Sequence, residues 1–522
     1  MMAPAAVAPY NCATVASGPY SFARETVSQF AAAELGHTVD KAKYEREEPK
    51  LREALLNAQF DLATRKAFPA IIVIGGVDGA GKGETVNLLN EWMDPRHIHT
   101  HAFQDPSDEE QDRPPMWRYW RALPPKGTIG ILFGAWHTDP IVKRVARDID
   151  GAELGREIDA TLRFERMLVD EGALLIKLWF HLSKDRQRKR LRALEKNPLT
   201  RWRVTALDWK RFKMYDRFRR ISERYLRETS TGDAPWTIIE GYDERYRSLT
   251  AGNVILSSLR ARLQQPKQRG ARKTVRLPKL TDTKDLIGSI DLTARIDKKR
   301  YEKQLERLQG KLNGLSRHRK FNRMSVIVVF EGPDAAGKGG AIRRVTGALD
   351  ARQYQGIPIA APTEEERAQP YLWRFWRHLP RLGRFTIYDR SWYGRVLVER
   401  VEGFCTESDW KRAYGEINDF EEQLSRSGAV VAKFWLQVSK AEQLKRFQER
   451  EHTSFKRFKI TADDWRNRDK WDAYRVAADE MIERTSTSRA PWTLVGANDK
   501  YHARITVLRS LCAQIERALN DR

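Results

Sequence analysis

Short apolar runs alternate with segments of helical periodicity through most of the chain. In its second half the apolar runs are Val326 to Phe330, Ile357 to Ala360, Phe385 to Tyr388, Val430 to Leu436 and Trp492 to Val495. Brief runs rich in β-branched and aromatic residues are typical of buried strands. Their alternation with helical segments indicates βαβ units. We therefore predict an α/β fold with a mostly parallel sheet and helices on both of its faces.

The first half of the chain repeats the second at a constant spacing. IIVIGGVDGAGKG ends at Gly83 and parallels IVVFEGPDAAGKG, which ends at Gly339; the two loop lysines are 338 − 82 = 256 positions apart. Trp117 and Trp373, in WRYW and WRFW, have the same offset. Self-similarity at so long a spacing indicates a duplicated domain rather than a solenoid of short repeats.

The repeat and the composition around it predict how the chain is divided. The residues before Thr38 are rich in Ala, Pro, Ser and Gly, which is typical of a flexible tail. The stretch QQPKQRGARKTVRLPK is basic and flanked by proline, which is typical of a linker. The predicted segments are a flexible tail at 1–37, a first domain at 38–265, a basic linker at 266–279 and a second domain at 280–522.

A glycine-rich stretch follows the first apolar run of the second domain and has the pattern G-x-x-x-x-G-K. Glycines let several backbone N–H groups turn toward one anion, and a helix N-terminus and a lysine add positive charge. A chance glycine-rich turn is the alternative. The position after the lysine lacks the usual Ser or Thr that contacts Mg²⁺, so Asp334 could supply an oxygen instead. The residues expected to bind phosphate here are Gly332, Ala336, Gly337, Lys338 and Gly339.

A second acid follows another predicted strand, in IYDRSWYGRVLVERVEG. Asp389 comes directly after the run Phe385 to Tyr388, and Arg390 follows it. An acid at the end of a buried strand, in a protein with a phosphate loop, suggests a magnesium ligand shared with Asp334. Arg390 could stabilise charge on a transferred phosphoryl group. The alternative is a helix N-cap next to a surface arginine.

A basic segment between residues 440 and 459 could form a lid over the phosphates. It holds seven basic residues and three acidic ones. A solvated helix face is the alternative interpretation. The residues of this region that we expect to meet phosphate are Arg446, Arg450, Lys456, Lys459 and Asp464.

The composition of the chain suggests that its partner is a polyanion. The chain carries 94 Lys and Arg against 70 Asp and Glu, a net charge of +24. Such a charge suggests nucleic acid, an anionic membrane surface or a phosphate polymer, or else a basic surface without a role. The chain has three cysteines without metal-ligand spacing, which fits a reducing compartment. The N-terminus is not a convincing signal peptide. No run of ~18 apolar residues is present that could span a membrane.

Taken together, these motifs resemble the polyphosphate kinase 2 family in its fused two-domain form. The matching pieces are GPDAAGKGG, YLWRFWRHLP, YDRSWYGRVLVERVEG, the pair Asp464–Trp465 and APWTLVGANDKYHAR. The loop alone is generic, whereas its combination with DRSWYGR is specific. The resemblance implies a P-loop kinase fold similar to thymidylate kinase, with three layers, a parallel sheet and a helical lid, present twice in tandem.

The resemblance also implies a function and its residues. Family members move a phosphoryl group between inorganic polyphosphate and a nucleotide with Mg²⁺, and the fused form typically converts AMP to ADP. Asp334 and Lys338 match the loop acid and lysine of the family. Asp389 and Arg390 match its second motif, while Arg446, Arg450 and Asp464 fall in its lid. Arg395 and Arg400, on the helix expected after Asp389, could meet nucleotide or phosphate.

For its surroundings, we expect a cytoplasmic protein with no membrane partner and no nucleic-acid partner. Self-association into a homo-oligomer stays open. Two other functions also stay open. An ATP-dependent nucleotide kinase would use the same loop, and a non-enzymatic nucleic-acid-binding protein would use the positive surface, although no helix-turn-helix or RNA-binding signature is evident.

The first domain departs from the pattern of the second. Phe133 and Gly134 stand 256 positions before Asp389 and Arg390, and Leu194 stands 256 positions before Arg450. Asp78, Lys82 and the loop glycines remain. Because phosphoryl transfer depends mainly on positioning and charge, we predict that the first domain is inactive or nearly so.

Overall fold

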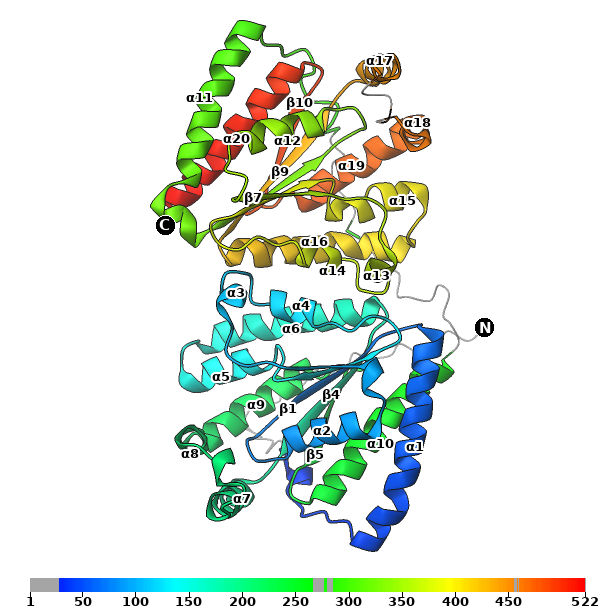
Figure 1. Cartoon of the computed structure of the whole chain (residues 1–522), viewed down its shortest axis with the longest axis vertical. Coiled ribbons are helices and arrows are strands. Elements are labelled where there is room, and N and C mark those ends of the chain that lie inside the picture. Colours follow the sequence, from blue (N-terminus) through cyan, green and yellow to red (C-terminus); the bar gives the residue numbers. More distant parts are fainter. Residues whose placement is uncertain (1–27, 266–276, 279–284, 455–457, 459, 522) are drawn as a thin grey trace, which may run out of the picture.

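The computed structural model describes residues 28–265, 277–278, 285–454, 458 and 460–521, and these form two α/β domains (Figure 1). Each domain is built on a five-stranded parallel sheet, in the orders β2-β3-β1-β4-β5 and β10-β9-β6-β8-β7. The duplicated α/β fold predicted from the apolar runs is therefore confirmed. Most of the predicted linker, 266–276, lies outside the described residues, as do Lys456 and Lys459.

The first domain contains β1 (Ala70–Gly76), β2 (Ile98–Ala102), β3 (Ile129–Phe133), β4 (Leu174–His181) and β5 (Trp236–Glu240). Its helices are α1 (Lys41–Arg65), α2 (Lys82–Trp92), α3 (Asp108–Gln111), α4 (Trp117–Arg121), α5 (Thr138–Ala146), α6 (Gly151–Asp170), α7 (Lys184–Lys196), α8 (Ala206–Lys213), α9 (Tyr215–Thr229) and α10 (Glu244–Gln264). Short 3₁₀ helices are η1 (Ala31–Ala33), η2 (Pro95–His97) and η3 (Arg201–Arg203).

The second domain contains β6 (Ser325–Glu331), β7 (Tyr354–Pro358), β8 (Phe385–Asp389), β9 (Ala429–Gln437) and β10 (Trp492–Gly496). Its helices are α11 (Lys298–Ser316), α12 (Lys338–Thr346), α13 (Glu364–Arg367), α14 (Trp373–Trp376), α15 (Val398–Glu402), α16 (Glu407–Arg426), α17 (Lys440–Glu451), α18 (Ala462–Asp469), α19 (Trp471–Thr485) and α20 (Lys500–Asn520). Two further 3₁₀ helices are η4 (Arg319–Arg323) and η5 (Trp392–Arg395).

The central strand β6 explains why helices cover both faces of its sheet. All of its residues are buried, and successive side chains of a strand point to opposite faces. Val326 and Val328 pack in a core with α11, α12 and α20, whereas Ile327 and Val329 pack in a core with α14, α16 and α19. A strand that is apolar on both faces requires a layer of helices on each, which gives the three-layer arrangement.

Residues 28–37 correct the predicted extent of the tail, which was expected to run to His37. Phe30 is fully buried and stacks on His181 with ring centroids 4.2 Å apart. The backbone N–H groups of Gly36 and His37 donate to the buried carboxylate of Glu240. Burial of one aromatic ring and satisfaction of a buried carboxylate hold this segment against the first domain.

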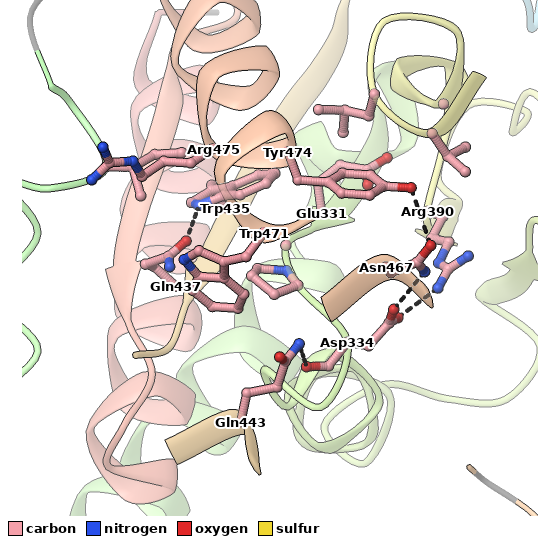
Figure 2. A pocket seen from close by; sticks show the side chains of 16 residues that line it. Glu331, Asp334, Arg390, Trp435, Gln437, Gln443, Asn467, Trp471, Tyr474 and Arg475 are labelled. Atoms are coloured by element: carbon pink, nitrogen blue, oxygen red, sulfur yellow. Dashed lines mark hydrogen bonds and ion pairs between the residues drawn. The ribbon is translucent and has the colours of Figure 1, made fainter. Parts of the chain in front are cut away.

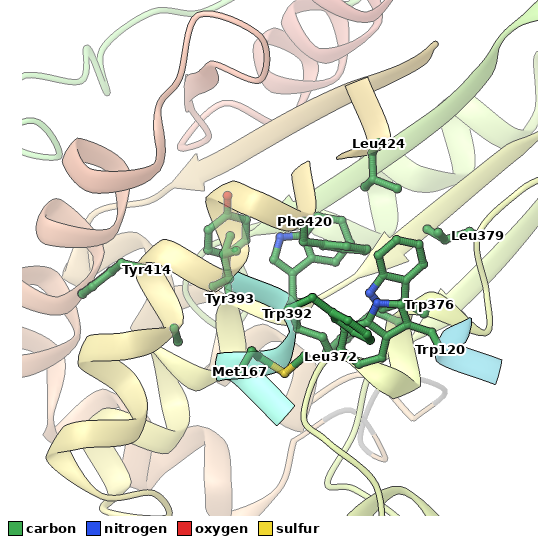
Figure 3. Close-up of a cluster of buried hydrophobic side chains, with 14 of the residues drawn as sticks. Trp120, Met167, Leu372, Trp376, Leu379, Trp392, Tyr393, Tyr414, Phe420 and Leu424 are labelled. Atoms are coloured by element: carbon green, nitrogen blue, oxygen red, sulfur yellow. The ribbon is translucent and has the colours of Figure 1, made fainter. Parts of the chain in front are cut away.

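The two domains meet along a shared apolar core through equivalent residues. Trp120 and Trp376, 376 − 120 = 256 positions apart, stack with ring centroids 5.4 Å apart (Figure 3). Arg163 and Asp419, also equivalent, form an ion pair with an N–O distance of 3.0 Å. Contacts between equivalent positions describe a pseudo-two-fold axis, as in a symmetric dimer. Among the described residues, no helix has the length and apolar character needed to cross a membrane.

Candidate active site

The loop after β6 has the backbone that a phosphate cradle requires. Gly332 has φ of 138°, and a β-carbon there would lie 2.2 Å from the Leu436 carbonyl oxygen, so only glycine fits. Gly337, with φ of 104°, is the N-cap of α12. Gly339 lies in the first turn of that helix, and Ala336 is buried under the loop. The first N–H groups of α12 therefore lie at the end of the loop, where the predicted phosphate would bind.

Lys338 folds back over the loop. Its Nζ donates to the carbonyl oxygens of Gly332, at 2.7 Å, and of Pro333, at 3.2 Å. This position holds the ammonium group beside the space that an anion on the loop would occupy. Phosphate binding by Lys338 stays a prediction that this position allows.

Asp334 and Arg390 come together, although they are 56 positions apart in the sequence. Arg390 Nη2 donates to Asp334 Oδ1 at 2.6 Å, and Asn467 Nδ2 donates to Asp334 Oδ2 at 2.8 Å (Figure 2). Burial raises the pKa of Asp334, but Lys338, Arg390 and these hydrogen bonds outweigh it, and the pKa lies below its usual value. Asp334 is therefore an ionised carboxylate at the edge of the loop.

Asp389 is the last residue of β8, and the register places it beside Phe330, next to the start of the loop. Sequence reasoning missed a third carboxylate here, Glu331, which is buried and accepts a hydrogen bond from Ser391 Oγ at 2.8 Å. Burial raises the pKa of Glu331. Its position directly after a wholly apolar run was a signal of a functional or paired acid, because a carboxylate at the buried end of a strand needs a hydrogen-bonding partner.

The donor atoms around the loop suit a hard divalent cation. Asp334 and Asp389 offer carboxylate oxygens at neighbouring strand ends, and Mg²⁺ is commonly held by one or two carboxylates with phosphate and water. Among the described residues, no group of three or more His, Cys, Asp and Glu could hold a metal by itself. A cation here would therefore depend on the oxygens of a bound phosphate as well.

The two arginines of α17 have different surroundings. Arg446 is buried and donates to the carbonyl oxygens of Ala335, at 2.9 Å, and Ala497, at 2.7 Å. It ties the loop to the segment after β10 and lines a groove with Gly337, and its contact with phosphate stays a prediction. Arg450 is half-buried at the end of α17, and burial lowers its pKa. It lines a groove with the loop residues Ala336 and Gly337.

Asp464 has a local structural role. Its carboxylate accepts from the backbone N–H of Thr461 at 2.8 Å and completes a capping box at the start of α18. Asp208 does the same with Thr205 in the first domain. A capping carboxylate explains why this acid occurs in both copies, and the phosphate contact expected of Asp464 stays a prediction.

Arg395 lies near the pocket and Arg400 points elsewhere. The guanidinium of Arg395 stacks on Tyr371 at 4.0 Å. Burial lowers its pKa, but the carboxylates of Glu171 and Glu399 outweigh it and keep the pKa above its usual value. Arg400 donates to Tyr414 and pairs with Glu480 at 2.7 Å, so it joins α15 to α16 and α19 and is not brought to the loop.

A pocket opens beside the loop, between the ends of β6 and β9 and helix α19 (Figure 2). Asp334 and Arg390 lie on one side of it, and Trp435, Trp471 and Tyr474 form an aromatic wall. Sequence reasoning also missed Gln443, whose Nε2 donates to the Asp334 carbonyl oxygen at 3.0 Å. Such a pocket, apolar with a few convergent polar groups, is typical of a small-molecule site.

The first domain keeps the loop but lacks the acid and the arginine that follow it in the second domain. Lys82 donates to the carbonyl oxygen of Gly76 at 2.6 Å, and its Nζ lies 3.5 Å from Asp78. Phe133 ends β3 where Asp389 ends β8, and its ring lies 5.9 Å from Lys82 Nζ. Phe30 covers His181, the counterpart of Gln437 in the pocket of the second domain.

Comparisons with known proteins agree with this arrangement. The sequence model of the family described as Polyphosphate kinase 2 (PPK2) matches residues 38–267 and 295–522. A polyphosphate:AMP phosphotransferase of Pseudomonas aeruginosa is 58% identical over 94% of this chain and 99% of its own length. A protein of the same name from Pseudomonas syringae pv. tomato is 54% identical over 94% of this chain and 98% of its own length.

A solved structure shares the arrangement of both domains. The crystal structure described as a polyphosphate kinase 2 from Pseudomonas aeruginosa PA01 superimposes with a TM-score of 0.86 at 56% identity. It covers 94% of this chain and all of that chain, so the likeness includes the interface between the two domains.

Proposed function

Because the chain belongs to the polyphosphate kinase 2 family, we propose that it transfers the terminal phosphoryl group of inorganic polyphosphate to AMP and releases ADP. The names of full-length relatives support this reaction. The observation that carries the residue assignment is the meeting of Asp334, Lys338 and Arg390 around one loop of the second domain. Cys405 and Cys512 are free, in keeping with a reducing compartment, and we place the reaction in the cytoplasm.

The donor chain lies with its terminal phosphate on the loop. Lys338 and the N–H groups at the start of α12 hold the oxygens of that phosphate. Arg390, which is paired with Asp334 in the structure, stabilises negative charge on the transferred phosphoryl group. The oxygen of the AMP phosphate attacks in line, the bond to the next phosphate of the polymer breaks, and the polymer leaves one phosphate shorter. The acceptor is already ionised, so no strong general base is required.

The acceptor nucleotide lies in the pocket beside the loop. Trp471 and Tyr474 offer aromatic surface for a purine, and Arg390 stands between that wall and Asp334. Placing the acceptor phosphate next to Arg390 brings it to the edge of the loop. This geometry would align donor and acceptor without a covalent enzyme intermediate.

Asp334 and Asp389 would hold Mg²⁺, which when bound neutralises charge on the phosphate oxygens. The residues around them keep these carboxylates in place. Asn467 and Gln443 fix Asp334 through its side chain and its carbonyl oxygen. The first domain has phenylalanine and glycine in place of Asp389 and Arg390, so we propose that it does not turn over substrate.

The deciding assay incubates the full-length protein with AMP, Mg²⁺ and polyphosphate, without ATP, and measures ADP. We expect ADP to form in that mixture. Asp334→Asn should lower turnover by about 100-fold or more, because a charged group that stabilises the transition state is lost. The matched control is Asp78→Asn, the same change at the equivalent position of the first domain, which should leave turnover near that of the unchanged protein.

Two results would contradict the proposal. ADP formation with ATP as the only donor, and none with polyphosphate, would identify an ATP-dependent nucleotide kinase. Equal losses in Asp334→Asn and Asp78→Asn would mean that both loops work. Circular dichroism and thermal unfolding of each variant establish that a loss of turnover is not a loss of fold.

A further inference from the structure

The first domain carries a groove lined by arginines, away from its own phosphate loop. It lies between α5 and α9 and has an open volume of about 1210 Å³. We call it the arginine groove; its basic residues are Arg144, Arg147, Arg217, Arg220, Arg224 and Arg227. Glu223 is the acidic side chain of its lining, and that carboxylate accepts a hydrogen bond from the backbone N–H of Gln29.

Four of these arginines form a stripe along α9. Arg217, Arg220, Arg224 and Arg227 follow one another at steps of three, four and three residues, which places them on one helix face. Ten residues of helix span about 15 Å, so the stripe is longer than one phosphate group. Like charges at this spacing repel one another, and a bound linear polyanion would remove that cost.

The second domain does not have this stripe, although its fold is the same. The residues 256 positions later are Ala473, Val476, Glu480 and Glu483. In that domain Arg400 pairs with Glu480 at 2.7 Å. In the first domain the equivalent positions are both basic, Arg144 and Arg224, so a cation faces a cation where the other copy has an ion pair.

Several groove arginines have no protein carboxylate to neutralise them. Arg224 pairs with Glu228 on its own helix, and Arg144 and Arg217 donate to the carbonyl oxygens of Ile149 and Val145. Among the described residues, the remaining three form no ion pair within 4.0 Å; they are Arg147, Arg220 and Arg227. Exposed guanidinium forks of this kind bind phosphate oxygens in pairs.

We propose that the arginine groove is a second binding site for condensed phosphate, which holds a distant part of the polymer whose end reacts in the second domain. The proposal rests on the proposed function for its choice of polyanion. In Figure 1, α5 and α9 lie at the left of the lower domain, while α15, α17 and α18 lie at the right of the upper one. A chain held at two such places has its reactive end kept at high local concentration.

The arginine groove should make the enzyme bind long polyphosphate chains more tightly than short ones. A polymer of hundreds of phosphates can contact the groove and the loop together, whereas tripolyphosphate reaches one of them at a time. Groove binding should therefore lower KM for long chains without changing kcat. It should also make binding of long chains more sensitive to salt than binding of short ones.

The test compares Arg220→Ala/Arg227→Ala with Arg192→Ala/Arg260→Ala in the full-length protein. The control removes the same charge from two exposed arginines of the first domain that lie outside the groove. We expect the groove variant to raise KM for long-chain polyphosphate at least fivefold. Its kcat, its KM for AMP and its KM for tripolyphosphate should equal those of the unchanged protein. The control variant should equal the unchanged protein in kcat and in all three KM values, including that for long-chain polyphosphate.

A binding assay separates this inference from the proposed reaction. Retention of long-chain polyphosphate is measured directly, with single-stranded RNA as a second probe, so the result stands even without turnover. Loss of polyphosphate retention in the groove variant alone supports the site. Equal retention by both variants, equal losses in both, or a loss confined to RNA would overturn it.

Discussion

At the scale of single residues, the two domains differ at two strained backbone positions. Ala335 and Arg390 have φ of 61° and 64°, and Gly79 and Gly134 hold the equivalent positions with φ of 79° and 72°. A β-carbon in the left-handed region costs roughly 1–2 kcal/mol. The active loop therefore retains strain that the first domain has lost, which is common where a side chain has to be held for function.

Exchanging these residues should change stability in opposite directions. We expect Ala335→Gly to raise the free energy of unfolding of the second domain by up to about 1 kcal/mol, and Gly79→Ala to lower that of the first by a similar amount. Crowding is not the reason, since a β-carbon at Gly79 would have Arg190 Cγ as its nearest neighbour, at 3.6 Å. Urea unfolding of each variant measures the change. Shifts of the same sign in both variants would contradict the strain argument.

A buried histidine makes the first domain sensitive to acid. His137 is 2% exposed, and burial, followed by the charges of Lys82 and Lys177, lowers its pKa to about 3. An unfolded histidine takes up a proton near pH 6.5. Below that pH the unfolded chain binds more protons than the folded one, so stability falls as the pH falls from about 6.5 toward 3.

The second domain supplies the replacement that tests this effect, because Tyr393 holds the equivalent position. From pH 7.5 to 5.5 the histidine should cost the first domain about 1.4 kcal/mol, and His137→Tyr should remove that cost. Thermal unfolding at both pH values measures it. His99→Gln, at an exposed position, is the control and should keep the full pH dependence. An unchanged pH dependence in His137→Tyr would rule out His137 as its source.

At the scale of elements, helix α18 depends on its first turn. Asp464 and Thr461 form the capping box that starts it, and Asn467 on the same helix contacts Asp334. The capping box therefore sets the position of a residue at the active loop. Loss of such a cap typically costs about 1 kcal/mol.

A conservative change separates capping from catalysis. An amide oxygen can still accept from the N–H of Thr461, so Asp464→Asn should keep turnover within about threefold of the unchanged protein. Asp464→Ala should lose more, through disorder of α18. Steady-state kinetics with AMP and polyphosphate measure both. A loss in Asp464→Asn as large as that expected for Asp334→Asn would contradict a capping role alone and would place Asp464 in contact with substrate.

The elements were largely predictable from the sequence, because strands and loop follow from local patterns. Apolar runs located every strand of the second domain, with β7 beginning three residues before the run at Ile357. Contacts across the chain were not predictable in this way. Gln443 and Asn467 reach Asp334 from 109 and 133 positions away, and neither sits in a recognisable motif.

The basic residues were the least predictable part of the site. A sequence gives their charge but not their partners, and the partners decide whether a guanidinium is free to meet a substrate. Arg446 donates to carbonyl oxygens and Arg400 pairs with Glu480, whereas Arg390, paired with Asp334, lines the pocket. Phosphate contacts of Lys456 and Lys459 stay predictions, since both lie outside the described residues.

At the scale of the whole molecule, one of the hydrophobic cores contains residues of both domains. Trp376 and Phe420 of the second domain pack with Trp120 and Met167 of the first (Figure 3). Equivalent polar contacts flank this core. Gln369 donates to Leu123, and its counterpart Arg113 donates to Leu379, each at 3.1 Å. Neither domain can leave the other without exposing aromatic surface.

The second domain alone should therefore pair with itself. We expect residues 280–522, expressed separately, to form dimers through Trp376 and Phe420, since the same surface can face its own copy. Sedimentation velocity gives the mass. Trp376→Glu should weaken the dimer, and Arg426→Glu, at an exposed position on the edge of the same interface, should have a smaller effect. A stable monomer of the unchanged half would contradict this prediction.

The pseudo-two-fold axis has a consequence for how the protein can change over time. In a dimer of identical chains, every substitution is made twice, so a change that suits one half is forced on the other. Covalent fusion removes that constraint. Phe133 and Gly134 could replace an acid and an arginine in one half while their twins stayed intact. If the second domain alone turns over substrate, as proposed, the protein has no second centre to cooperate with, and its rate should rise with AMP along a simple hyperbola.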